Sequence, residues 1–570
     1  MNVSSRLVFI SGLLACGLLP ARLALAAWPS DPFANVPLCT AAGAQTTPAI
    51  ISDGAGGAIV AWADARSGNR DIYVQRISAD GAPLWTAGGV PLSTVTGDQA
   101  NPTLVTDGAG GAIVTWHDIR SGTTFDIYAQ RVDASGAPQW TADGAEVCTS
   151  ASHQQFPTLT TDGAGGAIVT WFDFRSGNYD IYAQRIAPGG AMLWTANGVA
   201  ISTAPRHQEY PTIVPDDAGG AIITWFDQRT GDSYTFSDIY AQRISSDGTV
   251  QWTANGVPLC TATGDQSNPT IATDGASGAI VTWFDYRSGN YDIYAQRIDA
   301  SGTVQWAADG VALNTLPGEQ AYPTIVSDAA GGAIVTWRDH GGGKNYDVRA
   351  QRISGAGATQ WISQGVVVCS AADDQDDPTI IPDGAGGAII SWWDYRFNNG
   401  DVYAARVLAN GSLPWTPDGV VISKAVGSQI LPAIAPDLSG GAILAWQDGR
   451  VADTDIYAQR VTKLGELGGA PRIGVPAVSE IAFALESVRP NPSRSGSAMR
   501  LPLTLPDSGP ASLQLVDVRG RLVATREVGS LGAGRHVVDL ATGLELRAGV
   551  YLVRLTQGGL QRTTRAVVLE

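Results

Sequence analysis

The chain of 570 residues holds 53 acidic and 36 basic residues, a formal net charge of −17, and only 16% of its residues are charged. This balance argues against nucleic acid as a partner, because binding to phosphate needs a basic surface. The length allows two or more domains, and 68 Gly, 31 Pro and 17 Trp are typical of many short strands and turns.

Residues 1–26 predict a secretory signal peptide that is cleaved. Arg6 gives a small positive start, an apolar run follows from Leu7, and Ala24-Leu25-Ala26 offers a cleavage site. An alternative is lipidation of Cys16, because Leu13–Cys16 resembles a bacterial lipobox with an unusual Leu at its middle position. Both interpretations export the protein, so we expect it to be secreted or held at the outer membrane or cell surface.

Residues 27–467 are dominated by an internal repeat with a period of 54 to 58 residues. Its first Asp occurs eight times: Asp53, Asp107, Asp162, Asp216, Asp274, Asp328, Asp383 and Asp437. Each copy contains four strand patterns joined by turns rich in Gly and Asp, which is the size of one β-propeller blade. We therefore predict an all-β fold whose main part is an eight-bladed β-propeller.

The two ends of the repeat predict how the propeller closes. The eighth copy stops after its third strand, near Lys463, and residues 35–50 match the fourth strand and the start of the next copy elsewhere. Trp28 lies three residues upstream of the register of the other copies. We expect the N-terminal strand to complete the last blade, because this removes exposed sheet edges.

Each copy repeats charged residues, as in Trp171-x-Asp173-x-Arg175 of the third copy, followed by Arg185. We interpret these as ion pairs that fix strand register rather than as sites, since an enzyme needs one asymmetric constellation and equal repeats give equal environments. The Gln-x-x-Pro loop of each copy is expected to satisfy backbone groups at one rim.

Four cysteines share one repeat position, in alternate copies: Cys39, Cys148, Cys260 and Cys369. Equivalent atoms in alternate blades lie too far apart for a disulfide. We predict four buried, unpaired thiols, although exported proteins commonly form disulfides.

The sixth copy departs most from the repeat, with the sequence RDHGGGKNYDVRAQR. Gly341 stands where other copies have Arg, and Arg349 replaces the usual Tyr. One hypothesis is that Arg349 supplies the missing guanidinium. A second is a ligand-binding patch made of His340, Lys344 and Arg349. The fourth copy also departs, through a longer hairpin over 229–238.

A cluster of acids follows the sixth copy and lies on the same predicted rim: Asp373, Asp374, Asp376 and Asp377. Carboxylates could bind Ca²⁺, a hard cation that takes oxygen ligands. The alternative is solvated charge, because no complete calcium-loop motif is present. No spacing predicts a zinc site, a phosphate loop or a catalytic nucleophile, and no other cofactor is expected.

The string DGAGGAIVTWFDFRSGNYDIY, which begins at Asp162, resembles the propeller repeats of the Tol-system periplasmic protein. The resemblance implies a propeller and no particular function. The segment SADGAPLW, from Ser78 to Trp85, departs from a sialidase-type Asp-box because its Asp and Gly are adjacent.

Residues 468–480 predict a linker, and 481–570 a small Ig-like β-sandwich with eleven Arg, seven acids and no Lys. Four motifs, VRPNPSRSG, LQLVDVRGRLV, LGAGRHVVDL and LRAGVYLVRL, resemble the C-terminal sorting domain of type IX secretion cargo and the related FlgD-like Ig module. The resemblance implies outer-membrane secretion machinery as a partner. The alternative is a sandwich without a sorting role.

These features predict a binding module for extracellular carbohydrate or protein that is not an enzyme. Two alternatives stay open: a glycan-active hydrolase of the sialidase-like propeller type, and a purely structural surface component.

Overall fold

The computed structural model describes residues 28–570 except 231–235, 342, 398, 469–483 and stretches near the C-terminus (486–487, 489–490, 495–498, 506–508, 529–533, 540–545, 558–559 and 570). The predicted signal peptide, Cys16, most of the predicted linker and part of the longer fourth hairpin lie outside these residues. The chain divides into two compact units, Met1–Pro471 and Arg472–Glu570. Within the described part, no helix is long and apolar enough to cross a membrane.

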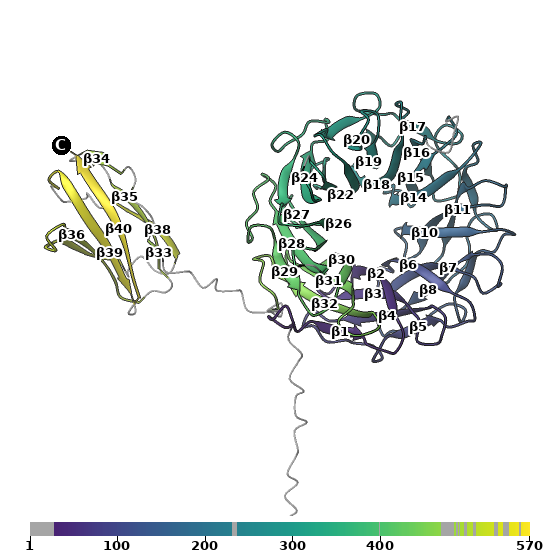
Figure 1. Cartoon of the computed structure of the whole chain (residues 1–570), viewed down its shortest axis with the longest axis horizontal. Helices are drawn as coiled ribbons and strands as arrows, with labels where there is room; N and C mark the ends of the chain where they lie inside the picture. The colour runs from purple at the N-terminus through teal and green to yellow at the C-terminus, as the bar shows by residue number, and fades with distance from the viewer. Residues whose placement is uncertain are drawn as a thin grey trace, which may run out of the picture. The chain divides into compact units, whose positions relative to one another are not determined.

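The first unit consists of eight four-stranded antiparallel sheets arranged around an open centre (Figure 1). The innermost strands are β2 (Gln45–Ser52), β6 (Gln99–Thr106), β10 (Gln154–Thr161), β14 (Gln208–Pro215), β18 (Gln266–Thr273), β22 (Gln320–Ser327), β26 (Gln375–Pro382) and β30 (Gln429–Pro436). The second strands are β3 (Ala58–Asp64), β7 (Ala112–Asp118), β11 (Ala167–Asp173), β15 (Ala221–Asp227), β19 (Ala279–Asp285), β23 (Ala333–Asp339), β27 (Ala388–Asp394) and β31 (Ala442–Asp448).

The third strands are β4 (Asp71–Ile77), β8 (Asp126–Val132), β12 (Asp180–Ile186), β16 (Asp238–Ile244), β20 (Asp292–Ile298), β24 (Asp347–Ile353), β28 (Asp401–Val407) and β32 (Asp455–Val461). The outer strands are β5 (Val90–Ser93), β9 (Ala145–Cys148), β13 (Val199–Ser202), β17 (Val257–Cys260), β21 (Val311–Asn314), β25 (Val366–Cys369), β29 (Val420–Ser423) and β1 (Val36–Cys39). Each outer strand has only four residues, because the chain turns between the preceding Trp, such as Trp140, and the strand, such as β9.

The last sheet takes its outer strand from the N-terminal segment, since β1 pairs antiparallel with β32. Trp28 supplies this sheet with the contact that Trp85 and its equivalents make elsewhere: its Nε1 donates to the carbonyl of Ala79 in the sheet of β2–β5 at 2.9 Å. Its ring lies on Gly81, where the φ is +85° and a Cβ would lie only 2.9 Å from the ring, so both the backbone and the contact require glycine. Trp28 thus makes the repeated contact from a shifted position in the sequence.

The second strands form the core of each sheet. A representative one, β11, reads AIVTWFD and is buried along its whole length. Both faces of a sheet pack against neighbouring sheets, so apolar residues occupy both faces and the usual alternation with polar residues is lost. The eight second-strand tryptophans are completely buried: Trp62, Trp116, Trp171, Trp225, Trp283, Trp337, Trp392 and Trp446.

The repeated charges form ion pairs within each sheet, as predicted. Asp173 is fully buried, accepts from Trp171 Nε1 at 3.0 Å and pairs with Arg175 at 2.5 Å. Arg185 pairs with Asp162 at 2.9 Å and also donates to the carbonyl of Ser246 in the next sheet. These contacts close the loop between strands and fix neighbouring sheets, which is a structural role.

The four predicted thiols are free and buried. In the third sheet Arg175 Nη2 lies 3.1 Å from Cys148 Sγ, so the thiol helps to enclose the ion pair of that sheet. Burial raises the pKa of the Cys148 thiol to about 12, which leaves it protonated and unreactive at neutral pH.

The second unit contains a three-stranded and a five-stranded sheet. The first is made of β33 (Ala484–Leu485), β35 (Arg500–Leu505) and β38 (Gly534–Asp539), and the second of β34 (Ser493–Arg494), β40 (Leu560–Leu569), β39 (Gly549–Gln557), β36 (Ala511–Asp517) and β37 (Leu522–Glu527). Leu501, Leu513 and Val553 belong to a core shared by both sheets.

Candidate functional site

Each innermost strand breaks its hydrogen-bond ladder at the Gln-x-x-Pro segment. The register shifts there in all eight sheets, and the residue before the proline adopts a left-handed φ between 45° and 53°. We call these eight residues the left-handed ring: Thr47, Asn101, Phe156, Tyr210, Asn268, Tyr322, Asp377 and Leu431. Such bulges redirect a side chain out of the sheet.

The glutamines of these segments fix the bulge from beneath. Gln99 is completely buried, and its Nε2 donates to the carbonyl of Gly97 at 2.6 Å. The corresponding glutamines of the other sheets donate to their own loops in the same way. The prediction that these loops satisfy backbone groups is confirmed.

Threonines after the prolines tie neighbouring sheets together around the centre. Thr212 donates to the carbonyl of Pro269 at 3.2 Å, and Thr270 to that of Pro323 at 3.1 Å. Ala49 and Ala433 occupy this position in the first and last sheets and have no hydroxyl to donate. The backbone of the left-handed ring is therefore held by bonds that do not involve the side chains of the ring itself.

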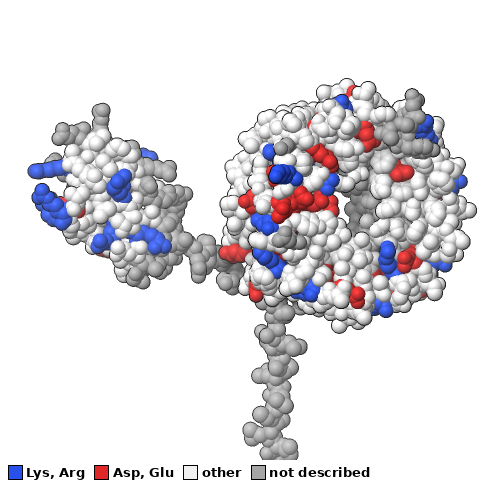
Figure 2. Space-filling model, viewed as in Figure 1, with Lys and Arg blue, Asp and Glu red and all other residues white. Residues whose placement is uncertain are grey.

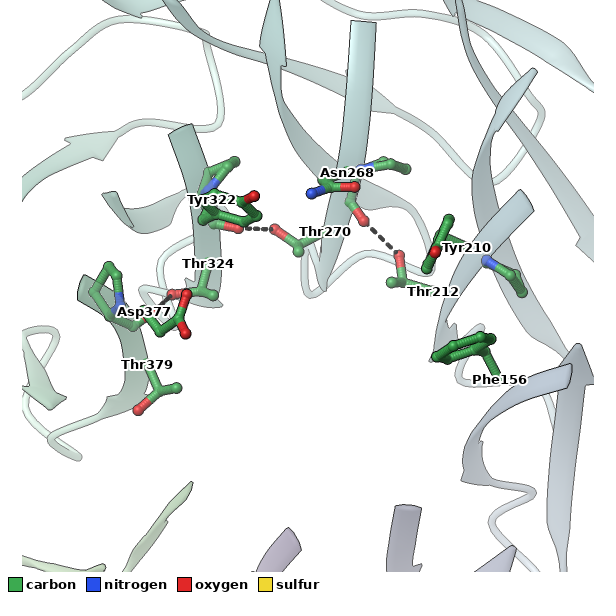
Figure 3. A pocket seen from close by; sticks show the side chains of 13 residues that line it. Phe156, Tyr210, Thr212, Asn268, Thr270, Tyr322, Thr324, Asp377 and Thr379 are labelled. Atoms are coloured by element: carbon green, nitrogen blue, oxygen red, sulfur yellow. Dashed lines mark hydrogen bonds between the residues drawn. The ribbon is translucent and has the colours of Figure 1, made fainter. Parts of the chain in front are cut away.

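Those ring side chains differ from sheet to sheet, and three of them are large and exposed. Phe156, Tyr210 and Tyr322 are 38%, 44% and 43% exposed. Figure 3 shows these rings around one open space with Asn268 and Asp377. A left-handed φ is a genuine outlier for a bulky residue, whereas Asn and Asp tolerate it.

Two adjoining pockets lie among these residues, with volumes of about 400 and 440 Å³. Phe156, Asp377 and Thr379 line both of them. We call the two pockets together the central site. Volumes of this size fall within the range of small-ligand pockets.

The exposed rings pack on buried or half-buried aromatic residues of the second strands. Phe156 stacks on Phe172 with centroids 5.4 Å apart, and Tyr210 on Phe226 at 5.6 Å. Tyr322 meets Phe284 at 5.9 Å. These contacts orient the rings while leaving much of their surface open to a ligand.

Arg338 supports the same site from the sixth sheet. Its guanidinium lies 4.3 Å from the ring centroids of both Tyr322 and Tyr346. It also pairs with Asp376 at 2.9 Å and with Glu319 at 3.2 Å. The cation is neutralised by its two acids and holds Tyr322 in place by a cation–π contact.

Asp377 supplies the only carboxylate among the residues that line the central site. Burial and the neighbouring charge of Asp376 raise the pKa of Asp377, while Arg338 opposes this shift. Its backbone N–H donates to Asp376 Oδ1 at 3.0 Å, and its carboxyl lies at the pockets (Figure 3).

The predicted patch in the sixth sheet is only partly brought together. Arg349 forms an ion pair with Asp339, which confirms that it supplies the guanidinium absent at Gly341. Lys344 and Arg349 line a separate polar pocket of about 360 Å³. His340 instead packs against the ring of Tyr346, with centroids 5.0 Å apart. Ligand binding by these three residues stays a prediction.

The four predicted calcium ligands do not converge. Asp376 pairs with Arg338, Asp374 accepts from the Tyr346 backbone at 2.9 Å, and Asp377 faces the central site. Asp373 lies exposed in the preceding turn. Within the described part of the chain, no group of three or more His, Cys, Asp or Glu side chains is arranged to hold a metal. The four acids therefore do not form the oxygen cage that the calcium hypothesis requires.

The aromatic members of the left-handed ring were missed by reasoning from sequence. A signal was present, because Asn101, Asn268 and Asp377 occupy the same repeat position, and both Asn and Asp tolerate a left-handed backbone. Their equivalents Phe156, Tyr210 and Tyr322 conceal it, since aromatic residues before proline suggest an extended strand.

Comparison with known proteins does not place this chain in a family. Neither a family model nor a curated protein matches this chain. Among solved structures, an ulvan lyase of a polysaccharide lyase family is 12% identical over 77% of this chain and 97% of its own, with a TM-score of 0.43. An α-L-arabinanase of Penicillium chrysogenum is 9% identical over 76% and 99%, with a TM-score of 0.34. A eukaryotic initiation factor is 11% identical over 77% and 91%, with a TM-score of 0.36.

Two of these structures are carbohydrate-active enzymes, which contradicts the prediction that the protein is not an enzyme. That prediction rested on the equality of the repeats, and the central site shows that the repeats are unequal at one position. At this low identity and these TM-scores, the similarity assigns no reaction or substrate to this chain.

Proposed function

We propose that this protein is an exported β-propeller protein that binds carbohydrate chains at its central site. The proposal treats the eight sheets as blades of a propeller that the N-terminal strand closes. It treats the second unit as an Ig-like sorting module that engages outer-membrane secretion machinery. Mass spectrometry of both termini of protein from spent medium tests the export part, because it reveals signal-peptide cleavage, any lipid on Cys16 and the fate of the C-terminal unit.

The observation that carries the binding proposal is the presence of large, exposed aromatic rings on a left-handed backbone. A non-glycine residue in this conformation costs about 1–2 kcal/mol. Phe156, Tyr210 and Tyr322 recover only part of this through burial, since each is more than a third exposed. Stability alone favours Asn, which stands at Asn101 and Asn268, so a recognition role explains the aromatic residues.

The remaining lining fits a sugar ligand. Aromatic faces stack on the apolar faces of sugar rings, while Asn268, Thr324 and Asp377 present polar groups to hydroxyls. A mostly apolar pocket with a few polar groups that fix orientation is the usual form of a small-ligand site.

A second candidate function is cleavage of the bound chain, and Asp377 favours it. Its carboxyl faces the central site and has a raised pKa, which suits a group that gives a proton to a leaving oxygen. Glycoside hydrolysis in most families uses a second carboxylate. The appearance of new reducing ends on incubation, and its loss in Asp377→Asn, would support this candidate.

The binding proposal is tested with the variants Phe156→Asn, Tyr210→Asn and Tyr322→Asn on an array of neutral, acidic and amino-sugar oligosaccharides. Stacking of this kind contributes about 1 kcal/mol or more, so each variant should weaken binding by roughly fivefold to tenfold. Phe33→Asn is a matched control, because Phe33 is 58% exposed and lines neither pocket. Unchanged glycan binding in all three ring variants would contradict the proposal, and retention of a protein ligand alone would favour a protein partner.

A further inference from the structure

We infer that the chain bound at the central site carries free ammonium groups, as a polymer of de-acetylated amino sugars does. This inference rests on the proposed function and names the ligand class of the same site. It follows from the charges of the lining, from the charges around it and from the kind of rings present.

The lining of the central site carries a single charge, which is negative. Asp377 is the single charged side chain among the described residues of the two pockets, and the others are Pro, Thr, Asn, Ala, Leu, Phe and Tyr. None of these lining residues is Lys, Arg or His. Arg338 acts on Asp377 only from a distance, because its ion pairs are with Asp376 and Glu319. A partly buried carboxylate without a direct ion pair is costly, and a ligand ammonium would supply that pair.

The electrostatic field around the central site is also negative. In Figure 2 the acidic side chains gather beside the open centre, over the sector of β22 and β26. The acids of this sector include Glu319, Asp373, Asp374, Asp376 and Asp377, and its cations include Arg338, Lys344 and Arg349. Arg349 is paired with Asp339. Arg338 is already paired with two of the acids, so the remaining field is negative. Such a field concentrates cations and repels uronate or sulfated chains.

The aromatic rings of the central site are also suited to a cation. Tyrosine and phenylalanine faces attract cations through their quadrupoles, and aromatic rings beside a carboxylate are a common way to recognise an ammonium group. Tyr322 already makes such a contact with Arg338 along one side. Tyr210 has no cation over it among the cation–π contacts of the described residues; it is 44% exposed and lines the site.

The test measures binding of the full chain by calorimetry to three oligosaccharides of equal length: glucosamine, N-acetylglucosamine and a uronate. We expect the glucosamine chain to bind at least about tenfold more tightly than the acetylated one, because a charge-assisted contact of this kind contributes about 1.5–3 kcal/mol. This preference should shrink as salt is raised, and the uronate chain should not bind.

The variant Asp377→Asn should abolish the preference while leaving the fold intact, since Asn is the natural residue at the equivalent positions 101 and 268. Glu466→Gln is the control, because it removes one negative charge from an exposed residue outside both pockets. Equal affinity for the glucosamine and acetylated chains, or a preference that survives Asp377→Asn, would overturn the inference but leave the proposed function standing. Failure of every glycan to bind would instead remove the proposed function.

Discussion

The second strands and the left-handed ring, only one strand apart in each sheet, behave in opposite ways. In the second strand, Trp, Asp and the buried aliphatic residues recur in every sheet and are almost inaccessible to solvent. In the left-handed ring, the backbone recurs, with φ between 45° and 53° in all eight sheets, but the side chains are of six different types. Repetition of side chains marks the scaffold here, and variation on a repeated backbone marks the site.

The contrast also shows how the site can vary without damage to the fold. Bonds from the buried glutamines, such as Gln99 to Gly97, and from the threonines hold the bulge. The ring side chain takes no part in these bonds, so it can be aromatic, amide, acidic or aliphatic. We call the second strands the scaffold layer and the left-handed ring the site layer. If the two layers are independent, a change in one should leave the property of the other unchanged.

The largest effect is expected from the scaffold layer, in Asp173→Ala. The change removes a fully buried carboxylate and leaves Trp171 Nε1 and Arg175 without their acceptor. Breaking a buried ion pair from one side costs about 3–5 kcal/mol. Chemical denaturation should show this loss in the free energy of unfolding, while Asp80→Ala, in a surface turn, should change it little. A similar loss in both variants would mean that the repeated acids are not the scaffold.

The next largest loss of stability is expected in the sixth sheet, where Gly341 replaces the Arg that pairs with the second-strand Asp elsewhere. Arg349→Tyr leaves buried Asp339 without a guanidinium, because Gly341 supplies none. We expect a loss of about 3 kcal/mol. The double variant Gly341→Arg/Arg349→Tyr recreates the arrangement of the other sheets. Trp337 Nε1, which now lacks a hydrogen-bond partner, could then donate to Asp339, as Trp171 donates to Asp173. Thermal denaturation should show recovery in the double variant, and equal losses would show that Arg349 is not a replacement.

Sequence reasoning predicted the scaffold layer well and the site poorly, for one physical reason. A scaffold feature such as Asp173 with Arg175 is repeated, so its role follows from counting copies. The site depends on the φ of the residue before each proline, for which steric preference suggests an extended backbone. The left-handed conformation is held in part by bonds between neighbouring sheets, such as that of Thr212 to the carbonyl of Pro269, which no local pattern reveals. One departure that the sequence did flag, Arg349 in the copy that has Gly341, forms an ion pair of the scaffold with Asp339.

A third prediction concerns the acids that open the third strands. Asp126 and Asp401 are buried opposite the paired Asp of the second strand, and desolvation raises the pKa of each to about 6. The paired Asp adds to each shift, while nearby cations, Lys424 foremost for Asp401, oppose it. The same direction holds for the equivalents: Asp71, Asp180, Asp238, Asp292, Asp347 and Asp455.

The sign of the effect on stability follows from proton linkage. A folded-state pKa above the unfolded value means that the folded state binds protons more tightly, so stability is present below about pH 4 and is lost as pH rises through about 6. The melting temperature should therefore be higher at pH 5 than at pH 7.5. Asp126→Asn should reduce this dependence, while a melting temperature that rises steadily toward pH 7.5 would contradict it. Asp64 opposes the trend at lower pH, because bonds from Arg66 and Trp62 outweigh its desolvation and lower its pKa.

The smallest change in stability is expected from exchanging residues within the left-handed ring. These variants also separate the scaffold layer from the site layer most sharply. Tyr210→Asn places a residue that tolerates the left-handed backbone where a bulky one now stands, and Asn268→Tyr does the reverse. Relief of backbone strain should stabilise the first variant by about 1 kcal/mol, less the loss of the Tyr210–Phe226 contact, and the second should lose a similar amount. Denaturation midpoints measured beside glycan affinities should then move in opposite directions for Tyr210→Asn, with stability rising as binding falls. If stability and binding fell together, the tyrosine would belong to the scaffold, and the distinction between a repeated frame and a variable site would fail at this position.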